Sequence, residues 1–190
     1  MKIVGVNGSA RRGGNTAALI EAVFAPLRSA GHECELIELA GKDVRGCTAC
    51  GVCREKADRQ CHGRRDDANA VISALFDADA IVLGSPTYFA DVTAEMKALI
   101  DRAGYVSRGN GNVLARRPGA AVVAVRRGGA IHAFDTINHF FLIGEMIVVG
   151  SDYWNMGVGG PKGAVESDEE GMATMARLGE NLGWVLERLS

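Results

Sequence analysis

The stretch KIVGVNGSARRGGNT, residues 2–16, decides the fold of this chain. Residues 2–7 are largely apolar and run into a glycine, as a buried parallel strand does. Residues 15–30 then place apolar side chains at helical spacing, and Gly31 follows as a stop signal. The stretch therefore predicts a strand, a glycine-rich loop and a helix in direct succession.

The loop between this strand and this helix carries groups suited to an anion. Its glycines allow close backbone approach, and Ser9, Asn15 and Thr16 offer hydroxyl and amide groups. The free N–H groups at the start of the helix complete a site for which phosphate is the natural occupant. The alternative is a plain glycine turn in which Asn or Thr caps the helix.

Several phosphate-binding loops are excluded by residues that this loop lacks. No Lys-Ser or Lys-Thr pair follows the glycines, so the loop of nucleoside triphosphatases does not fit, and the Gly-x-Gly-x-x-Gly fingerprint is missing. A low-molecular-weight tyrosine phosphatase would need a cysteine here, and a response regulator would need acidic residues. A monophosphate held without metal or lysine remains.

The rest of the chain repeats the alternation of strand and helix. Strands are expected at 2–7, 33–39, 80–83, 119–125 and 145–150, and helices at 15–30, 66–78, 92–103, 132–143 and 168–189. This alternation favours an α/β fold, a doubly wound parallel sheet with its ligand crevice at the carboxyl ends of the strands. We expect one domain over residues 1–190, with an irregular insertion at about 40–65 that is too long for an ordinary loop.

Composition narrows the class of protein. The 190 residues are 47% hydrophobic and carry 21 basic against 23 acidic side chains, which excludes a disordered chain and predicts no binding to nucleic acid or membrane. No apolar run reaches the ~20 residues that span a bilayer, and the first residues lack a signal-peptide core. We therefore expect a cytoplasmic protein, in which the five cysteines are not structural disulfides.

Two glycine-containing loops resemble the flavodoxin-like NADPH-dependent FMN reductase family: GSARRGGNT at 8–16 and GSPTYF at 84–89. Further similarity lies at RRGG, 126–129, and at GSDYWN, 150–155. The resemblance implies the strand order 2-1-3-4-5, an FMN phosphate on the first loop and the flavin ring along the second, with NAD(P)H as a candidate electron donor. The implied cofactor-binding residues are Ser9, Arg11, Gly14, Asn15, Thr16, Pro86, Thr87, Tyr88, Phe89, Arg127, Gly128 and Gly129.

Alternatives stay open for parts of this set. Tyr88 and Phe89 offer flat apolar surface to a flavin, but they could also be ordinary aromatics at a strand end. Arg127 could place positive charge near the pyrimidine edge of the flavin and raise its reduction potential. It could equally belong to an exposed arginine pair.

Four cysteines crowd into the irregular insertion with the spacing C-x2-C-x2-C-x7-C: Cys47, Cys50, Cys53 and Cys61. Three closely spaced thiolates could bind three corners of a cubane metal cluster, and the more distant cysteine could bind the fourth. The spacing resembles the iron–sulfur flavoprotein branch of the same family, which implies a [4Fe–4S] cluster. Redox-active thiols without a cluster, or zinc with His62, are the alternatives. Several arginines of the insertion would offset the charge of a cluster: Arg45, Arg54, Arg59, Arg64 and Arg65.

These features together predict an FMN-dependent electron-transfer oxidoreductase in which the flavin does the chemistry and no side chain acts as acid or base. One rival is an NAD(P)H-dependent FMN or quinone reductase without a cluster, and another is a non-enzymatic zinc-binding module. A ferredoxin-like protein or a nicotinamide is the candidate donor. We also expect a homodimer or homotetramer, in which the cysteine loop lies near the flavin of a neighbouring subunit and Tyr153 and Trp154 anchor the interface.

Overall fold

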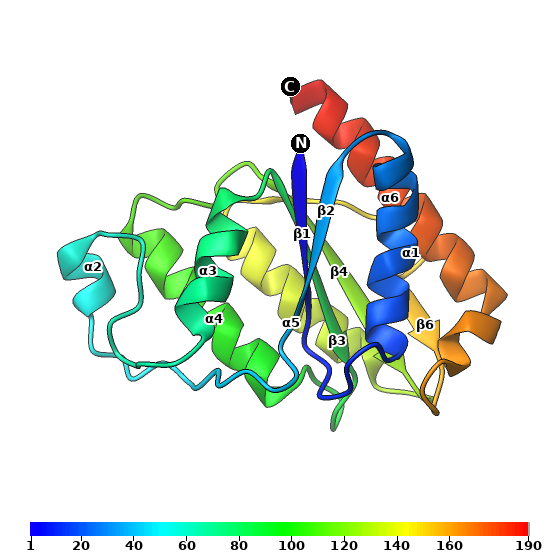
Figure 1. Cartoon of the computed structure of the whole chain (residues 1–190), viewed down its shortest axis with the longest axis horizontal. Coiled ribbons are helices and arrows are strands. Elements are labelled where there is room, and N and C mark those ends of the chain that lie inside the picture. The colour runs from blue at the N-terminus through cyan, green and yellow to red at the C-terminus, as the bar shows by residue number, and fades with distance from the viewer. Residues whose placement is uncertain (190) are drawn as a thin grey trace.

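A computed structural model of the chain describes residues 1–189, as a parallel sheet with helices on both faces (Figure 1). The strands are β1 (Lys2–Asn7), β2 (Glu33–Glu38), β3 (Ala80–Pro86), β4 (Pro118–Val125), β5 (Ile147–Val148) and β6 (Met156–Val158). The helices are α1 (Asn15–Ser29), α2 (Val52–Lys56), α3 (Ala68–Asp77), α4 (Ala94–Gly109), α5 (Ala130–Ile143), the short 3-10 helix η1 (Ala164–Ser167) and α6 (Glu169–Leu189). The sheet order is β2-β1-β3-β4-β5, which confirms the predicted flavodoxin-like topology.

Two apolar cores, one on each face of the sheet, hold the layers together. On one face α1 and α6 cover the sheet, and side chains such as Leu19, Phe24 and Leu182 are fully buried there. On the other face α3, α4 and α5 cover it, with Leu75 and Phe141 among the fully buried side chains. Because both faces are covered, the central strands are continuous apolar runs, the pattern from which they were predicted.

The predicted fifth strand, 145–150, is shortened in the structure to β5, and a further strand, β6, follows outside the predicted range. β5 pairs with the start of β4, and β6 pairs with its end, so two short strands share one edge of β4. Between them the chain loops outward, and Ser151 donates a hydrogen bond to Asn155 across the loop at 2.5 Å. Periodicity could not reveal β6, because three residues are too few to show an alternation.

Several helix boundaries also differ from expectation, and the insertion contains a helix. α3 begins at Ala68, after Asp66 and Asp67, and α4 continues to Gly109. The five residues of α2 lie in the predicted irregular insertion. No helix among residues 1–189 is long and apolar enough to cross a membrane.

The packing of α6 against α1 makes a testable prediction about two glycines of one helix. A Cβ at Gly179 would lie 2.2 Å from the carbonyl oxygen of Val23, whereas a Cβ at Gly183 would have its nearest neighbour, Leu27, at 3.5 Å. Gly179→Ala is expected to lower the free energy of unfolding by about 1–3 kcal/mol, because the helices must separate. Gly183→Ala is expected to leave it unchanged or raise it by up to about 1 kcal/mol, because alanine favours the helix.

Urea unfolding followed by circular dichroism measures both changes. Equal effects of the two substitutions would contradict the close approach of α6 and α1 at Gly179.

Candidate functional site

A cavity of about 200 Å³ lies at the carboxyl ends of β1, β3 and β4, where the chain order reverses between β1 and β3. Such a switch point is where open parallel sheets bind ligands. The loops after β1, β3, β4 and β6 form its walls. The lining residues are Ser9, Arg11, Asn15, Thr16, Pro86, Thr87, Tyr88, Ala124, Arg126, Gly159, Gly160 and Lys162.

The loop after β1 is held in place by hydrogen bonds to Asn7, at the end of β1, and to Glu38, at the end of β2. Asn7 is buried, accepts a hydrogen bond from the N–H of Ser9 at 2.9 Å, and donates to Glu38 at 2.7 Å. Glu38 also accepts from the N–H of Gly13 at 2.9 Å, where the backbone is left-handed with φ +56°. The loop is therefore organised before any ligand arrives.

This end of the cavity is suited to an anion. α1 begins after Gly14 without a side-chain cap and without an acidic residue in its first turn, so its N-terminal N–H groups stay available. Arg11, Arg126 and Lys162 add positive charge to the wall. Lys162 reaches across from the loop after β6 and donates to the carbonyl oxygen of Arg12 at 2.9 Å. The sequence predicted a phosphate site without a lysine. In the structure Lys162, from a distant part of the chain, lies in the wall of this site.

Asn15 lies in the cavity wall, and its side chain joins two segments of the chain. Its amide nitrogen donates to the carbonyl oxygens of Gly159 and Pro161, both at 2.9 Å. Its side-chain oxygen is buried without a hydrogen-bond partner. Because both amide hydrogens are used, the Asn15 side chain ties the loop after β6 to the start of α1.

The two predicted aromatic residues of the second loop separate. Tyr88 lines the cavity and pairs with Asp91 in a tight turn, with backbone hydrogen bonds of 2.8 and 3.0 Å. Phe89 and Ala90 occupy the turn in left-handed conformations, and the Phe89 side chain is fully exposed. Phe89 therefore projects into solvent and does not line the cavity.

The predicted Arg127, Gly128 and Gly129 line a neighbouring cavity of about 460 Å³, together with Tyr153 and Trp154. Arg126, the preceding residue, faces the first cavity instead. The predicted motif RRGG, residues 126–129, thus borders both cavities. The arginine in the wall of the first cavity is Arg126, one residue before the predicted Arg127. Gly14 precedes α1 and is not part of either wall.

The cysteine loop, residues 40–65, is fastened to α3 and α4. Asn69, in the first turn of α3, accepts from the N–H of Cys61 and donates to its carbonyl oxygen, both at 2.9 Å. Asn110, at the end of α4, donates to the carbonyl oxygen of Cys53 at 3.3 Å and accepts from the N–H of Arg59 at 2.8 Å. The sequence did not single out either asparagine.

The four cysteines of this loop differ in burial and in thiol chemistry. Cys47 and Cys50 are exposed, whereas Cys53 and Cys61 are buried. The backbone N–H of Val52, and then the Thr48 hydroxyl, lower the pKa of the Cys50 thiol. Burial, and then the neighbouring Cys61, raise the pKa of the Cys53 thiol. A Cβ on Gly63 would lie 3.2 Å from the Cys50 sulfur, so the two halves of the loop lie against each other.

Four of the predicted loop arginines have partners, two within the loop and two on neighbouring helices. Arg45 pairs with Asp43, Arg59 pairs with Asp77, and Arg64 donates to the carbonyl oxygen of Gly46. Arg54 stacks on the ring of Tyr105 at 5.2 Å. Arg65 is exposed. These contacts hold the loop in place.

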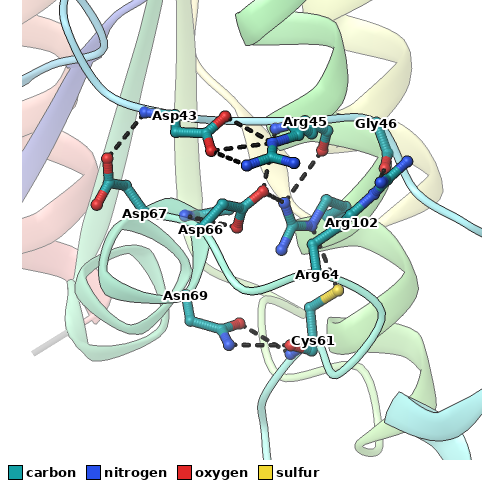
Figure 2. A network of polar contacts seen from close by, with 10 residues as sticks. Asp43, Arg45, Gly46, Cys61, Arg64, Asp66, Asp67, Asn69 and Arg102 are labelled. Atoms are coloured by element: carbon teal, nitrogen blue, oxygen red, sulfur yellow. Dashed lines mark hydrogen bonds and ion pairs between the residues drawn. The ribbon is translucent and has the colours of Figure 1, made fainter.

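Arg102 of α4 donates a hydrogen bond to a cysteine sulfur of the cysteine loop (Figure 2). Its Nε donates to the Cys61 sulfur at 3.3 Å, and its Nη1 donates to Asp66 at 2.6 Å and to the carbonyl oxygen of Arg45 at 3.0 Å. The side chains of Arg102 and Asp66 are both fully buried. Sequence reasoning missed Arg102, although a charged residue within the apolar face of a helix was a usable signal.

The donor set of the cysteine loop fits a soft metal or an iron–sulfur group by its chemistry. Its thiols share one tight wrap, with the N–H of Ala49 directed at the Cys47 sulfur at 3.4 Å. The sulfurs do not converge, however: no group of three or more His, Cys, Asp or Glu side chains among residues 1–189 is arranged around a common point. Four thiols are supplied, and closing them around one centre requires the loop to rearrange.

The anion cavity and the cysteine loop lie apart in the molecule. Figure 1 shows α2 at the left edge, beyond α3 and α4, whereas α1 and the loop after β6 lie at the right. In the cysteine loop, α2 packs against α4, and a Cβ on Gly109 would lie 2.8 Å from the Arg54 side chain. The two sites therefore occupy different sides of one chain.

Comparisons with known proteins agree with this geometry. The model of the NADPH-dependent FMN reductase family matches residues 1–160. An iron–sulfur flavoprotein of Methanocaldococcus jannaschii is 35% identical, with 98% of each chain covered. An iron–sulfur flavoprotein of Methanosarcina thermophila is 33% identical, with 98% of this chain and 96% of the relative covered.

Solved structures show the same fold at low sequence identity. An archaeal flavodoxin superposes with a TM-score of 0.65 and 19% identity, covering 98% of this chain and 99% of that one. The apo form of an NADH:FMN oxidoreductase superposes with a TM-score of 0.64 and 19% identity, covering 100% of this chain and 90% of that one. At this identity the likeness supports the fold alone.

Proposed function

The chain belongs to the NADPH-dependent FMN reductase family, and from that premise we propose that this FMN-dependent oxidoreductase passes electrons between a reduced donor, FMN and a [4Fe–4S] cluster. The observation that carries the proposal is the cavity at the switch point of the sheet. There the uncapped start of α1 meets Arg11, Arg126 and Lys162, and Tyr88 supplies an aromatic wall. Phosphate and flavin ring therefore have adjoining places.

FMN, when bound, supplies hydride and single-electron chemistry. The residues of the chain bind and orient it. The first-turn N–H groups of α1 and the cationic side chains hold the phosphate, and Ser9 and Thr16 offer hydroxyl groups beside it. The N–H and the hydroxyl of Thr87 both donate to the carbonyl oxygen of Ala124, which fixes the loop that borders the ring. No side chain is proposed to act as an acid or a base.

The cluster would be held by the thiolates of Cys47, Cys50, Cys53 and Cys61, and it would supply one-electron transfer. The names of the relatives and the spacing of the cysteines support this assignment. Small residues and backbone N–H groups around the sulfurs are the environment that tunes such centres. We propose that the protein works in the cytoplasm, where reducing conditions would keep these thiols available as ligands.

We further propose that the protein acts as a homodimer or homotetramer in which the cysteine loop of one chain approaches the FMN of another. The separation of the two sites within one chain supports this arrangement, because direct electron transfer needs short distances. Exposed aromatic side chains beside the cavity offer interface anchors: Phe89, Tyr153 and Trp154. The electron donor is a nicotinamide or a ferredoxin-like protein.

One experiment on anaerobically prepared protein tests this function. We expect flavin absorption bands over a broad background that bleaches on reduction, with iron and acid-labile sulfide present in equal amounts. Competition binding is expected to favour FMN over riboflavin, because riboflavin lacks the phosphate, and light scattering is expected to give a mass above 20.0 kDa. Flavin without iron would assign a reductase without a cluster, and zinc without flavin would overturn the proposed function.

A further inference from the structure

Arg102 occupies a position where a charged side chain is rarely found. It lies in the middle of α4 on the face that packs into the core, beside the buried residues Leu99, Ala103 and Val106, and its own side chain is 0% exposed. Removing a guanidinium from water carries a large cost unless its N–H groups are all used. The protein therefore retains a cation at this point for a reason that apolar packing does not supply.

The contacts of Arg102 lead to the cysteine loop. Nη1 is used on Asp66 and on the carbonyl oxygen of Arg45, and Nε donates to the Cys61 sulfur at 3.3 Å. Nη2 is buried and has no hydrogen-bond partner. A neutral thiol is a weak acceptor, so the ion pair with Asp66 alone leaves part of the guanidinium poorly satisfied.

Asp66 is engaged more fully than Arg102. Its carboxylate accepts from Arg102, from the N–H of Arg45 at 3.1 Å and from the N–H of Ala68 at 3.3 Å. Asp66 thus holds Arg102 from the side away from the cysteine, and the remaining N–H groups of Arg102 are left for a stronger acceptor. A thiolate that ligates a metal centre is such an acceptor.

We propose that Arg102 is a positioning residue for the cysteine loop: it holds the Cys61 sulfur and raises the reduction potential of the group that the four cysteines bind. This inference rests on the proposed function, because it presupposes a redox centre on these thiols. Reduction adds one electron, and hence one negative charge, next to a buried cation. The hydrogen bond from Nε of Arg102 to the Cys61 sulfur and the positive charge of Arg102 both stabilise the reduced state. Hydrogen bonds to sulfur are known determinants of the reduction potentials of iron–sulfur centres.

Asp66 is expected to affect the reduction potential in the opposite direction, because its charge is negative. Arg102→Gln removes the positive charge, and Asp66→Asn removes the negative charge that partly cancels it. We expect the equilibrium constant for one-electron reduction of the cluster to fall at least tenfold in Arg102→Gln, which is a decrease of about 59 mV. We expect it to rise in Asp66→Asn.

The measurement is a redox titration of the cluster and of FMN in the same anaerobic sample, followed by electron paramagnetic resonance and absorption. The FMN potential is expected to stay unchanged and serves as the internal control. Arg65→Gln is the matched variant, since Arg65 is an exposed arginine of the same loop and solvent screens its charge. Should Arg102→Gln fail to fold, Arg102→Lys replaces it and is expected to shift the potential in the same direction by a smaller amount.

The outcomes separate this inference from the proposed function. Wild-type protein with flavin but without iron and sulfide would overturn the cluster in the proposed function, and with it the premise of this inference. A wild-type cluster whose potential is unchanged in Arg102→Gln and in Asp66→Asn would overturn the inference alone. A purely structural Arg102 would lower the iron content of both variants without moving the two potentials in opposite directions.

Discussion

Arg102→Met is expected to lower the free energy of unfolding by about 3–5 kcal/mol, more than Gly179→Ala does. The reason is that the carboxylate of Asp66 would remain buried without its cation. Both side chains are 0% exposed and joined at 2.6 Å, so solvent cannot compensate. Urea unfolding of the apoprotein at neutral pH under reducing conditions measures the change.

The double variant Arg102→Met, Asp66→Leu is the control for this prediction. Replacing both charges with apolar side chains removes the uncompensated ion, so most of the lost stability is expected to return. If the double variant were destabilised by the sum of its single substitutions, the two side chains would not be energetically coupled, and the prediction would be wrong.

The ion pair of Asp66 and Arg102 should also make the stability of the protein depend on pH in acid. Burial opposes ionisation of Asp66, but hydrogen bonds from Arg102, Arg45 and Ala68 outweigh it and lower its pKa below the ordinary value. A lowered pKa contributes stability above the unfolded-state pKa of about 3.9, and this contribution is lost as the pH falls below it. The wild type should therefore lose more stability than the double variant when the pH falls from about 6 to about 3.

Most of the fold could be predicted because its signals are local. Strands such as β3 and β4 are unbroken apolar runs, and α1 and α6 show a clear helical period. The loop after β1 was predictable for the same reason, since its glycines and hydroxyl residues are consecutive. Each of these features can be read from neighbours in the sequence, with no knowledge of what packs against them.

The parts that were missed depend on contacts between distant segments. Lys162 reaches the first cavity from the loop after β6, and 150 residues separate it from Arg12, its hydrogen-bond partner. Arg102 meets Cys61 across 41 residues of chain. Asn15 was predicted to bind phosphate, and only the folded chain shows that Gly159 and Pro161 take its donors. No spacing rule encodes such pairings, because tertiary packing creates them.

Cys53→Ser is expected to abolish the bound iron and acid-labile sulfide while FMN stays bound. Serine is nearly isosteric with cysteine but is a poor ligand for this centre, and Cys53, buried on α2, is one of the four thiolates that would hold it. Iron, sulfide and flavin analysis of anaerobic protein measures the loss. Cys34→Ser on β2 is the matched control, since Cys34 lies outside the loop, and it should keep its iron. Equal iron in both variants, or equal loss from both, would contradict the assignment of the cysteine loop.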